Sequence, residues 1–149
     1  MSKLLPQANT LATVIKTFVF VSNKRDATLQ DIASFCAFDV RQASYYINAC
    51  IYLGLLNENY SISALGEEAL SDIGKVRQKV YEIILNDDLI GRMFHHRLFH
   101  NREETKKYAK NITAEIYSDY SDAVIERRAY SLEGWCEEIL DYLNQSNSL

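Results

Sequence analysis

One helical segment of the chain carries side chains that could contact DNA bases. When residues 40–53 are placed on a helix with 3.6 residues per turn, one face collects Arg41, Gln42, Tyr45, Asn48, Ala49 and Tyr52. Arg, Gln and Asn side chains make paired hydrogen bonds to guanine or adenine edges, and Tyr can contact a phosphate or stack. This face therefore predicts contact with DNA. The alternative is a solvated or protein-binding face, because only Arg41 is basic.

A second set of candidate residues lies in a basic stretch between Arg92 and Lys110. The stretch holds six basic and two acidic residues, whereas residues 111–149 hold two basic and eight acidic ones. Phosphate groups are bound mainly by Lys and Arg. We therefore predict phosphate contacts from Arg92, Arg97, Lys106, Lys107 and Lys110.

Two adjacent arginines near the C-terminus are expected to have different roles. On a helix from Ala123 to Leu143, an apolar stripe is formed by Ile125, Leu132, Cys136, Ile139 and Leu143, flanked by Trp135. Arg128 falls beside this stripe, so we expect its guanidinium to pair with a carboxylate or a carbonyl. Arg127 points away and is a further candidate for phosphate contact. We expect Glu126, Glu133 and Glu137 on the same outer face.

The remaining reactive residue types form no recognisable catalytic set. His96 and His100 are four residues apart, as two zinc ligands could be, but no third ligand follows at a usual spacing. The carboxylate pairs at 67–68 and 87–88 are adjacent, so their side chains diverge on a helix. The sequence has neither a Gly-rich phosphate loop nor a Ser-His-Asp or Cys-His set. It therefore predicts a protein that is not an enzyme and has no metal and no cofactor.

Capping residues and apolar spacing predict the elements that position these side chains. In the first half, helices should begin after Asn9 or Thr10, Thr28, Asp39 and Ser63. Ala37-Phe38 is expected to form the turn before the third helix, and Gly54 is expected to end that helix. Leu55-Leu56 and Tyr60-Ile62 are then expected to form two short strands of a small wing.

In the second half, helices should begin after Asp87 or Asp88, after Asn101, and after Ser121 or Asp122. We therefore predict a mainly α protein with tandem helix-turn-helix units. The first unit, over residues 9–70, is a winged helix-turn-helix with a small β-hairpin. The second, over residues 75–144, is a nearly all-helical helix-turn-helix-like unit. The two units are expected to pack as one compact body.

Two segments resemble winged-helix modules that accompany prokaryotic type II restriction endonucleases and related defence proteins. The segment SDAVIERRAYSLEGWCEEI is similar to their pattern of a capped helix, paired Arg, a small residue and a central Trp. The segment TLQDIASFCAFDVRQASYYINACIYLGLL, followed by a short wing, resembles the module that precedes it there. The resemblance covers about residues 11–143. It implies DNA contact or an accessory DNA-binding role, without cleavage.

Composition narrows the function classes. Hydrophobic residues make up 48% of the chain and charged residues 24%, which predicts a folded core. No apolar run approaches a membrane span, and the opening MSKLLPQANT lacks the apolar core of a signal peptide. The three cysteines lie in helical patterns and are expected to be buried thiols of a reducing cytosol. The net charge of −4 opposes simple attraction to DNA.

These observations favour a cytoplasmic, prokaryotic protein that binds double-stranded DNA in transcription regulation or restriction-modification. The alternative is a winged-helix protein that binds another protein, such as a phage-type inhibitor or adaptor that blocks a DNA-binding machine. A membrane partner is not expected. The sequence leaves open whether the chain forms a homodimer.

Overall fold

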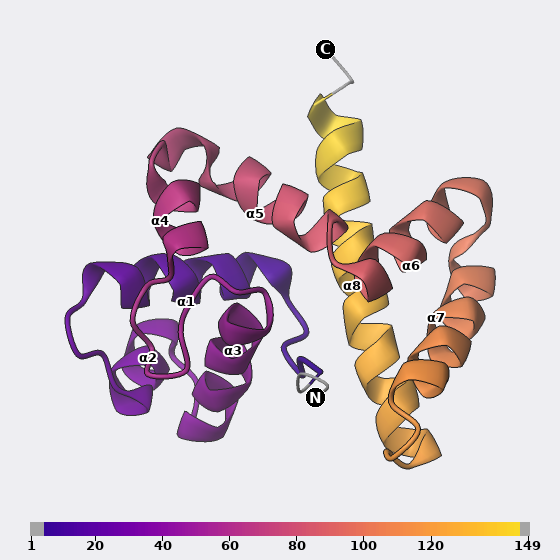
Figure 1. The fold of residues 1–149 in the computed structure, drawn as a ribbon, viewed down its shortest axis with the longest axis horizontal. Coiled ribbons are helices and arrows are strands. Elements are labelled where there is room, and N and C mark those ends of the chain that lie inside the picture. Colours follow the sequence, from indigo (N-terminus) through magenta and orange to yellow (C-terminus); the bar gives the residue numbers. More distant parts are fainter. Residues whose placement is uncertain (1–4, 147–149) are drawn as a thin grey trace. The chain divides into compact units, whose positions relative to one another are not determined.

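The structure is a computed structural model that describes residues 5–146, and this part of the chain is mainly helical, as predicted (Figure 1). The α-helices are α1 (Leu11–Asn23), α2 (Leu29–Cys36), α3 (Val40–Tyr52), α4 (Ala64–Leu70), α5 (Val76–Leu85), α6 (Asp88–Phe99), α7 (Arg102–Ile116) and α8 (Asp122–Ser146). A short 3-10 helix, η1 (Ile73–Lys75), precedes α5. None of the described helices is both long and apolar enough to cross a membrane.

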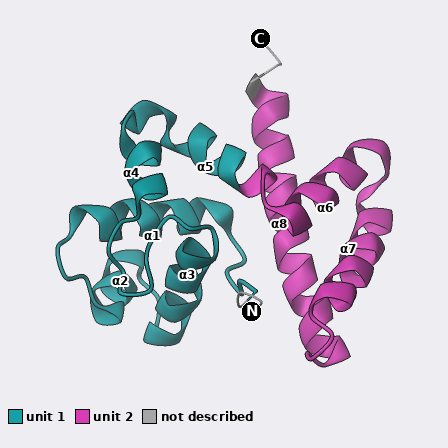
Figure 2. Cartoon of the chain, viewed as in Figure 1, with its two compact units in different colours: residues 1, 3–83 teal, residues 2, 84–149 magenta. Residues whose placement is uncertain are grey.

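The chain divides into two compact units (Figure 2). Unit 1 ends at Ile83 and unit 2 begins at Ile84, so the division falls inside α5. The units predicted from the sequence, over residues 9–70 and 75–144, place the boundary before α5. Unit 1 therefore contains α1 to α4 and most of α5, whereas unit 2 contains the end of α5 and α6 to α8.

Three of the expected caps start helices in unit 1. The hydroxyl of Thr28 accepts a hydrogen bond from the backbone N–H of Asp31 (3.1 Å), and the Asp31 carboxylate accepts one from the N–H of Thr28 (2.9 Å). The bonds donated by Thr28 lower the pKa of the Asp31 carboxyl. Asp39 and Ser63 cap α3 and α4 through their side-chain oxygens. Thr10 precedes α1 without a side-chain cap.

The core of unit 1 forms where α1 and α2 both pack against α3. Its largest fully buried side chains include Leu11, Phe18, Ile32, Ile47 and Leu55. Residues 37–39 connect α2 to α3, and Ala37 adopts a left-handed conformation with φ of 59°. Gly54 follows α3 with φ of 77°, which is the expected glycine signal for a helix end.

The two predicted strands after α3 are reduced to a single antiparallel bridge between Leu56 and Ile62. The intervening residues are used by a tight turn, in which the N–H of Asn57 donates to the carbonyl of Ser61 (2.8 Å). Tyr60 has a positive φ of 71°, which ends any extended pairing on that side. The hydroxyl and N–H of Ser63 then bond the carbonyl of Leu55, so the chain enters α4 at once.

Unit 2 is built from α6, α7 and α8, each of which contacts the other two. Asp87 caps α6, and Asn101 forms a capping box with Glu104 at the start of α7. The hydroxyl of Ser121 accepts from the N–H of Val124 (3.3 Å) at the start of α8. The buried core includes Ile90, Met93, Ile125, Leu132, Trp135 and Ile139. This confirms the predicted apolar stripe of α8 except at Leu143, which is 39% exposed.

Two of the three cysteines are buried, as expected, and the third is half-buried. Cys50 lies in unit 1 and donates to the carbonyl of Val14 (3.6 Å), whereas Cys136 lies in unit 2 and donates to the carbonyl of Ile90 (3.8 Å). Burial raises the pKa of both thiols, so both stay protonated and inert. Cys36 is half-buried, and all three thiols are free.

Candidate nucleic-acid interface

One face of α3 presents three of the predicted polar side chains to solvent. Arg41, Gln42 and Asn48 are exposed, and Tyr45 is half-buried between them. The Nε atom of Arg41 donates to the hydroxyl of Tyr45 at 2.6 Å, one helical turn away. This bond orients the guanidinium, while the Nη atoms have no hydrogen-bond partner among residues 5–146. A planar donor group is therefore held at the surface of a helix that is fixed to two others.

The burial of other side chains of α3 corrects the predicted face. Tyr52 is 5% exposed and Ala49 is fully buried, so neither belongs to the outer surface. Tyr46, which the projection did not select, is also buried and accepts a hydrogen bond from the N–H of Thr10 (3.3 Å). Val40, the first residue of α3, is 39% exposed. Ala49, Tyr46 and Tyr52 are buried because α3 packs against both α1 and α2. Two packing partners leave less of the helix surface exposed than a single buried stripe would.

Two arginines of the basic stretch are committed to ion pairs inside unit 2. The Nε atom of Arg102 donates to both carboxylate oxygens of Glu133 (3.0 and 3.2 Å), and that of Arg97 lies 3.1 Å from Glu137. Because Glu133 and Glu137 belong to α8, these pairs fasten α6 and α7 to it. The phosphate contact predicted for Arg97 would therefore have to compete with this ion pair.

Glu133 is the most buried charged side chain of the unit and corrects a second expectation. It was placed on the outer face of α8, but it is fully buried. Burial raises the pKa of its carboxyl, and the guanidinium of Arg102 opposes that rise. The helical projection of α8 could not predict this buried position, because the ion-pair partner that compensates the buried charge, Arg102, belongs to α7.

The lysines of α7 are partly committed as well. The ammonium of Lys110 donates to Asp122 (3.2 Å) and to Glu126 (3.0 Å), and these two carboxylates raise its pKa. Lys106 lies 3.8 Å from Glu103 and 5.6 Å above the ring of Tyr130. The phosphate contacts predicted for Lys106 and Lys110 would therefore have to compete with these ion pairs.

Three of the six cations predicted to contact phosphates keep unpaired charges among the described residues. Arg92, Lys107 and Arg127 are exposed and form no ion pair within residues 5–146. Two more cations, Lys24 and Arg25, were not selected from the sequence. They lie in the loop before α2 and line a cleft of about 450 Å³ with residues 59–62. The sequence alone does not indicate this cleft, because the two segments that line it are more than 30 residues apart in the chain.

Arg127 and Arg128 differ in burial as predicted. Arg127 is exposed, whereas Arg128 is half-buried, with its guanidinium carbon 4.7 Å from the centre of the Tyr120 ring. The expected carboxylate or carbonyl partner is absent from the described contacts, and the Nε atom of Arg128 is buried without a hydrogen bond. The arginine is therefore held by its aromatic neighbour and its packed stem.

Replacement of Arg128 by alanine should consequently destabilise unit 2 more than the same change at Arg127. We expect a loss of about 1–2 kcal/mol at Arg128, from the cation–π contact and the buried stem. The exposed Arg127 should lose less than about 0.5 kcal/mol. Urea unfolding followed by the fluorescence of Trp135, the only tryptophan, measures both variants. The reverse order would contradict the stacking role of Arg128.

The arrangement contains no recognisable metal centre within residues 5–146, since no group of three or more His, Cys, Asp or Glu side chains could hold an ion. The rings of His96 and His100 are stacked 3.8 Å apart rather than turned toward a common point. Within each ring, Nδ1 is already in a hydrogen bond.

The sequence matches one family, described as a domain of unknown function (DUF7226), over residues 13–144. The chain belongs to this family. The DUF7226 match includes α2, α3 and all the ion pairs of α8, so both units are part of what defines the family. No curated protein and no solved structure matches the chain.

Proposed function

We propose that this protein binds double-stranded DNA through the exposed face of α3, without catalysis. In this proposal α2, the turn at 37–39 and α3 act as a helix-turn-helix. The α3 helix enters the major groove, and the short turn at 57–61 takes the place of a wing. The observation that carries the proposal is the exposed set Arg41, Gln42 and Asn48 on a helix held by two others.

The chemistry of these three side chains supports contact with base edges. Arg makes two parallel hydrogen bonds to guanine, and Gln and Asn do the same with adenine. Recognition helices use residues near their N-terminus for such contacts, and all three positions lie in the first nine residues of α3. The bond from Arg41 to Tyr45 restricts the guanidinium before binding, which reduces the entropy lost on contact.

The near-neutral charge of unit 1 means that binding to DNA would depend on contacts with the bases more than on long-range attraction to the phosphates. Residues 5–83 contain seven basic and eight acidic residues, so the unit has no strong positive field. We therefore expect weak non-specific binding and a shallow fall of affinity with salt. Selection from a random-sequence duplex library, using the full chain at low salt, should enrich a common motif.

The critical variant is Arg41→Ala, measured on the enriched duplex. Loss of a paired contact to guanine should weaken binding by about 1–3 kcal/mol. The matched control is Lys75→Ala, which removes an exposed positive charge of unit 1 outside α3 and should have a small effect. Equal affinities of the two variants, or a library that shows no enrichment, would refute the proposal.

A protein partner is the second candidate, because two apolar side chains are exposed beside the same turn. Phe35 is 46% exposed and Val40 39% exposed, on either side of residues 37–39. Apolar side chains at such a position are typical of a contact surface. If the protein binds a protein partner instead of DNA, the duplex library should show no enrichment, and Phe35→Ser should weaken the complex with that partner.

A further inference from the structure

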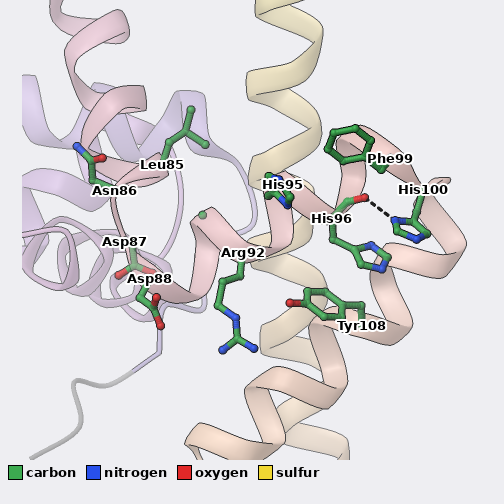
Figure 3. Close-up of a pocket in the computed structure, with 11 residues that line it drawn as sticks. Leu85, Asn86, Asp87, Asp88, Arg92, His95, His96, Phe99, His100 and Tyr108 are labelled. Carbon is green, nitrogen blue, oxygen red and sulfur yellow. Dashed lines mark hydrogen bonds between the residues drawn. The ribbon is translucent and has the colours of Figure 1, made fainter.

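Unit 2 contains a cleft of about 630 Å³ that none of the observations above explains (Figure 3). It is formed by the connection between α5 and α6, the length of α6, and one residue of α7. Its chemically active lining consists of Arg92, His95, His96, Phe99, His100 and Tyr108. A volume of this size is typical of small-molecule sites.

Three rings of the lining form a fixed column. The ring of His96 is stacked between that of His100, at 3.8 Å, and that of Tyr108, at 4.2 Å, with interplanar angles of 12° and 8°. The Nδ1 atom of His96 is hydrogen-bonded to the buried hydroxyl of Thr105 (2.9 Å). The Nδ1 atom of His100 donates to the carbonyl of His96 (2.9 Å). Stacked rings held in this way are a rigid platform for another flat ring.

Two further side chains of the cleft are exposed and available to a ligand. Phe99 is 72% exposed, which is unusual for a large apolar ring, and its only described ring contact is the tilted one with His95, at 5.3 Å. Arg92 is exposed and makes no ion pair within residues 5–146, whereas Arg97 and Arg102 of the same basic stretch are paired. The cleft thus combines exposed aromatic surface with one guanidinium that forms no ion pair among the described residues.

The acidic residues of the cleft limit what this ligand can be. Asp87 is used in capping α6, where it accepts from the N–H of Ile90 (3.0 Å), but Asp88 is exposed beside it. The exposed carboxylate of Asp88 would repel a highly charged anion such as a polyphosphate. It would accept hydrogen bonds from neutral hydroxyl groups, as sugars provide.

We propose that this cleft binds a nucleoside monophosphate. The flat base stacks on the ring surfaces of Phe99 and the His–Tyr column, the phosphate pairs with Arg92, and a ribose hydroxyl donates to Asp88. This site is distinct from the α3 surface, and its existence does not depend on DNA binding. Stacking accepts any base, so AMP and CMP should both bind.

Calorimetric titration of the full chain with AMP, adenosine and ribose 5-phosphate tests the proposal. We expect AMP to bind at least about tenfold more tightly than either fragment, because each fragment lacks one of the two recognised groups. Equal binding of ribose 5-phosphate and AMP would overturn the stacking role, and absence of AMP binding would overturn the site.

Two exposed-residue variants assign the groups without threatening the core. Arg92→Gln should weaken AMP about tenfold and leave adenosine unchanged, whereas Phe99→Ala should weaken both. Lys107→Gln is the matched control, since it removes an exposed, unpaired cation of α7 that does not line the cleft. If Arg92→Gln and Lys107→Gln bind AMP equally, the phosphate does not lie at Arg92 and the proposal fails.

Discussion

Replacement of Arg102 by methionine should lower the free energy of unfolding of unit 2 by about 2–4 kcal/mol, because it removes the ion-pair partner of a buried carboxylate. Glu133 is fully buried, and both of its oxygens accept from the Nε atom of Arg102. Methionine keeps most of the aliphatic stem, so the loss reports mainly the charge. Urea unfolding followed by Trp135 fluorescence measures it.

Two comparisons isolate the ion pair. The double variant Arg102→Met/Glu133→Met should recover most of the loss, because an apolar pair replaces the uncompensated charge. Lys107→Met removes an exposed, unpaired cation from the same helix and should change stability by less than about 0.5 kcal/mol. A loss at Arg102 no larger than at Lys107 would mean that the carboxylate does not need its partner.

The pH dependence of this loss has a defined sign. Burial raises the pKa of the Glu133 carboxyl above its ordinary value of 4.5, so its ionised form is the disfavoured one in the folded unit. A raised carboxyl pKa contributes stability at pH values below 4.5, and the contribution disappears as pH rises through the folded pKa. Without Arg102 the folded pKa should rise further. The deficit of Arg102→Met should therefore be largest at neutral pH and smaller at about pH 5.

The second large effect is expected at Gly66 in α4. A Cβ atom added there would lie in steric overlap with the backbone carbonyl oxygen of Leu55 and 2.9 Å from a side-chain carbon of Ile62. Backbone cannot move aside as a side chain can, so Gly66→Ala should cost about 3 kcal/mol. The loss should appear as an earlier thermal transition by circular dichroism, together with faster amide hydrogen exchange in α3 and α4.

Gly134→Ala is the matched comparison for glycine substitution in a helix. An added Cβ at Gly134 meets nothing within 4 Å, so alanine should stabilise α8 by about 0.5–1 kcal/mol through its higher helix propensity. Opposite signs at the two glycines would support the close approach of α4 to residue 55. A neutral Gly66→Ala would show that α4 can shift away from it.

The helix starts could be predicted because their signals are local. Thr28, Asp39, Ser63, Asp87 and Asn101 each accept from a backbone N–H three residues later, so a few neighbouring letters contain the whole interaction. The replacement of the expected hairpin by a single bridge could not be predicted in this way. It depends on the left-handed conformation of Tyr60 in the turn at 57–61, whereas glycine or asparagine is the usual sequence signal for that conformation.

The candidate sites were harder to predict because they depend on distant partners. Arg97 and Glu137 are 40 residues apart, and Arg102 and Glu133 are 31 apart, so charge patterns alone identified a basic surface where ion pairs form. The burial of Tyr52 required knowledge that α3 contacts two helices. Similarly, the spacing of His96 and His100 indicated a shared face, but Tyr108 joins their stack only through the packing of α7.

The two buried cysteines have a practical consequence. Cys50 is enclosed in unit 1 and Cys136 in unit 2, and neither thiol can ionise readily in its folded surroundings. An alkylating reagent can therefore reach each sulfur only when its own unit opens. With Cys36 replaced by serine, peptide mapping of the alkylated chain records the opening rate of each unit separately. The two native cysteines thus serve as intrinsic probes of opening, one for each unit, and no label has to be introduced.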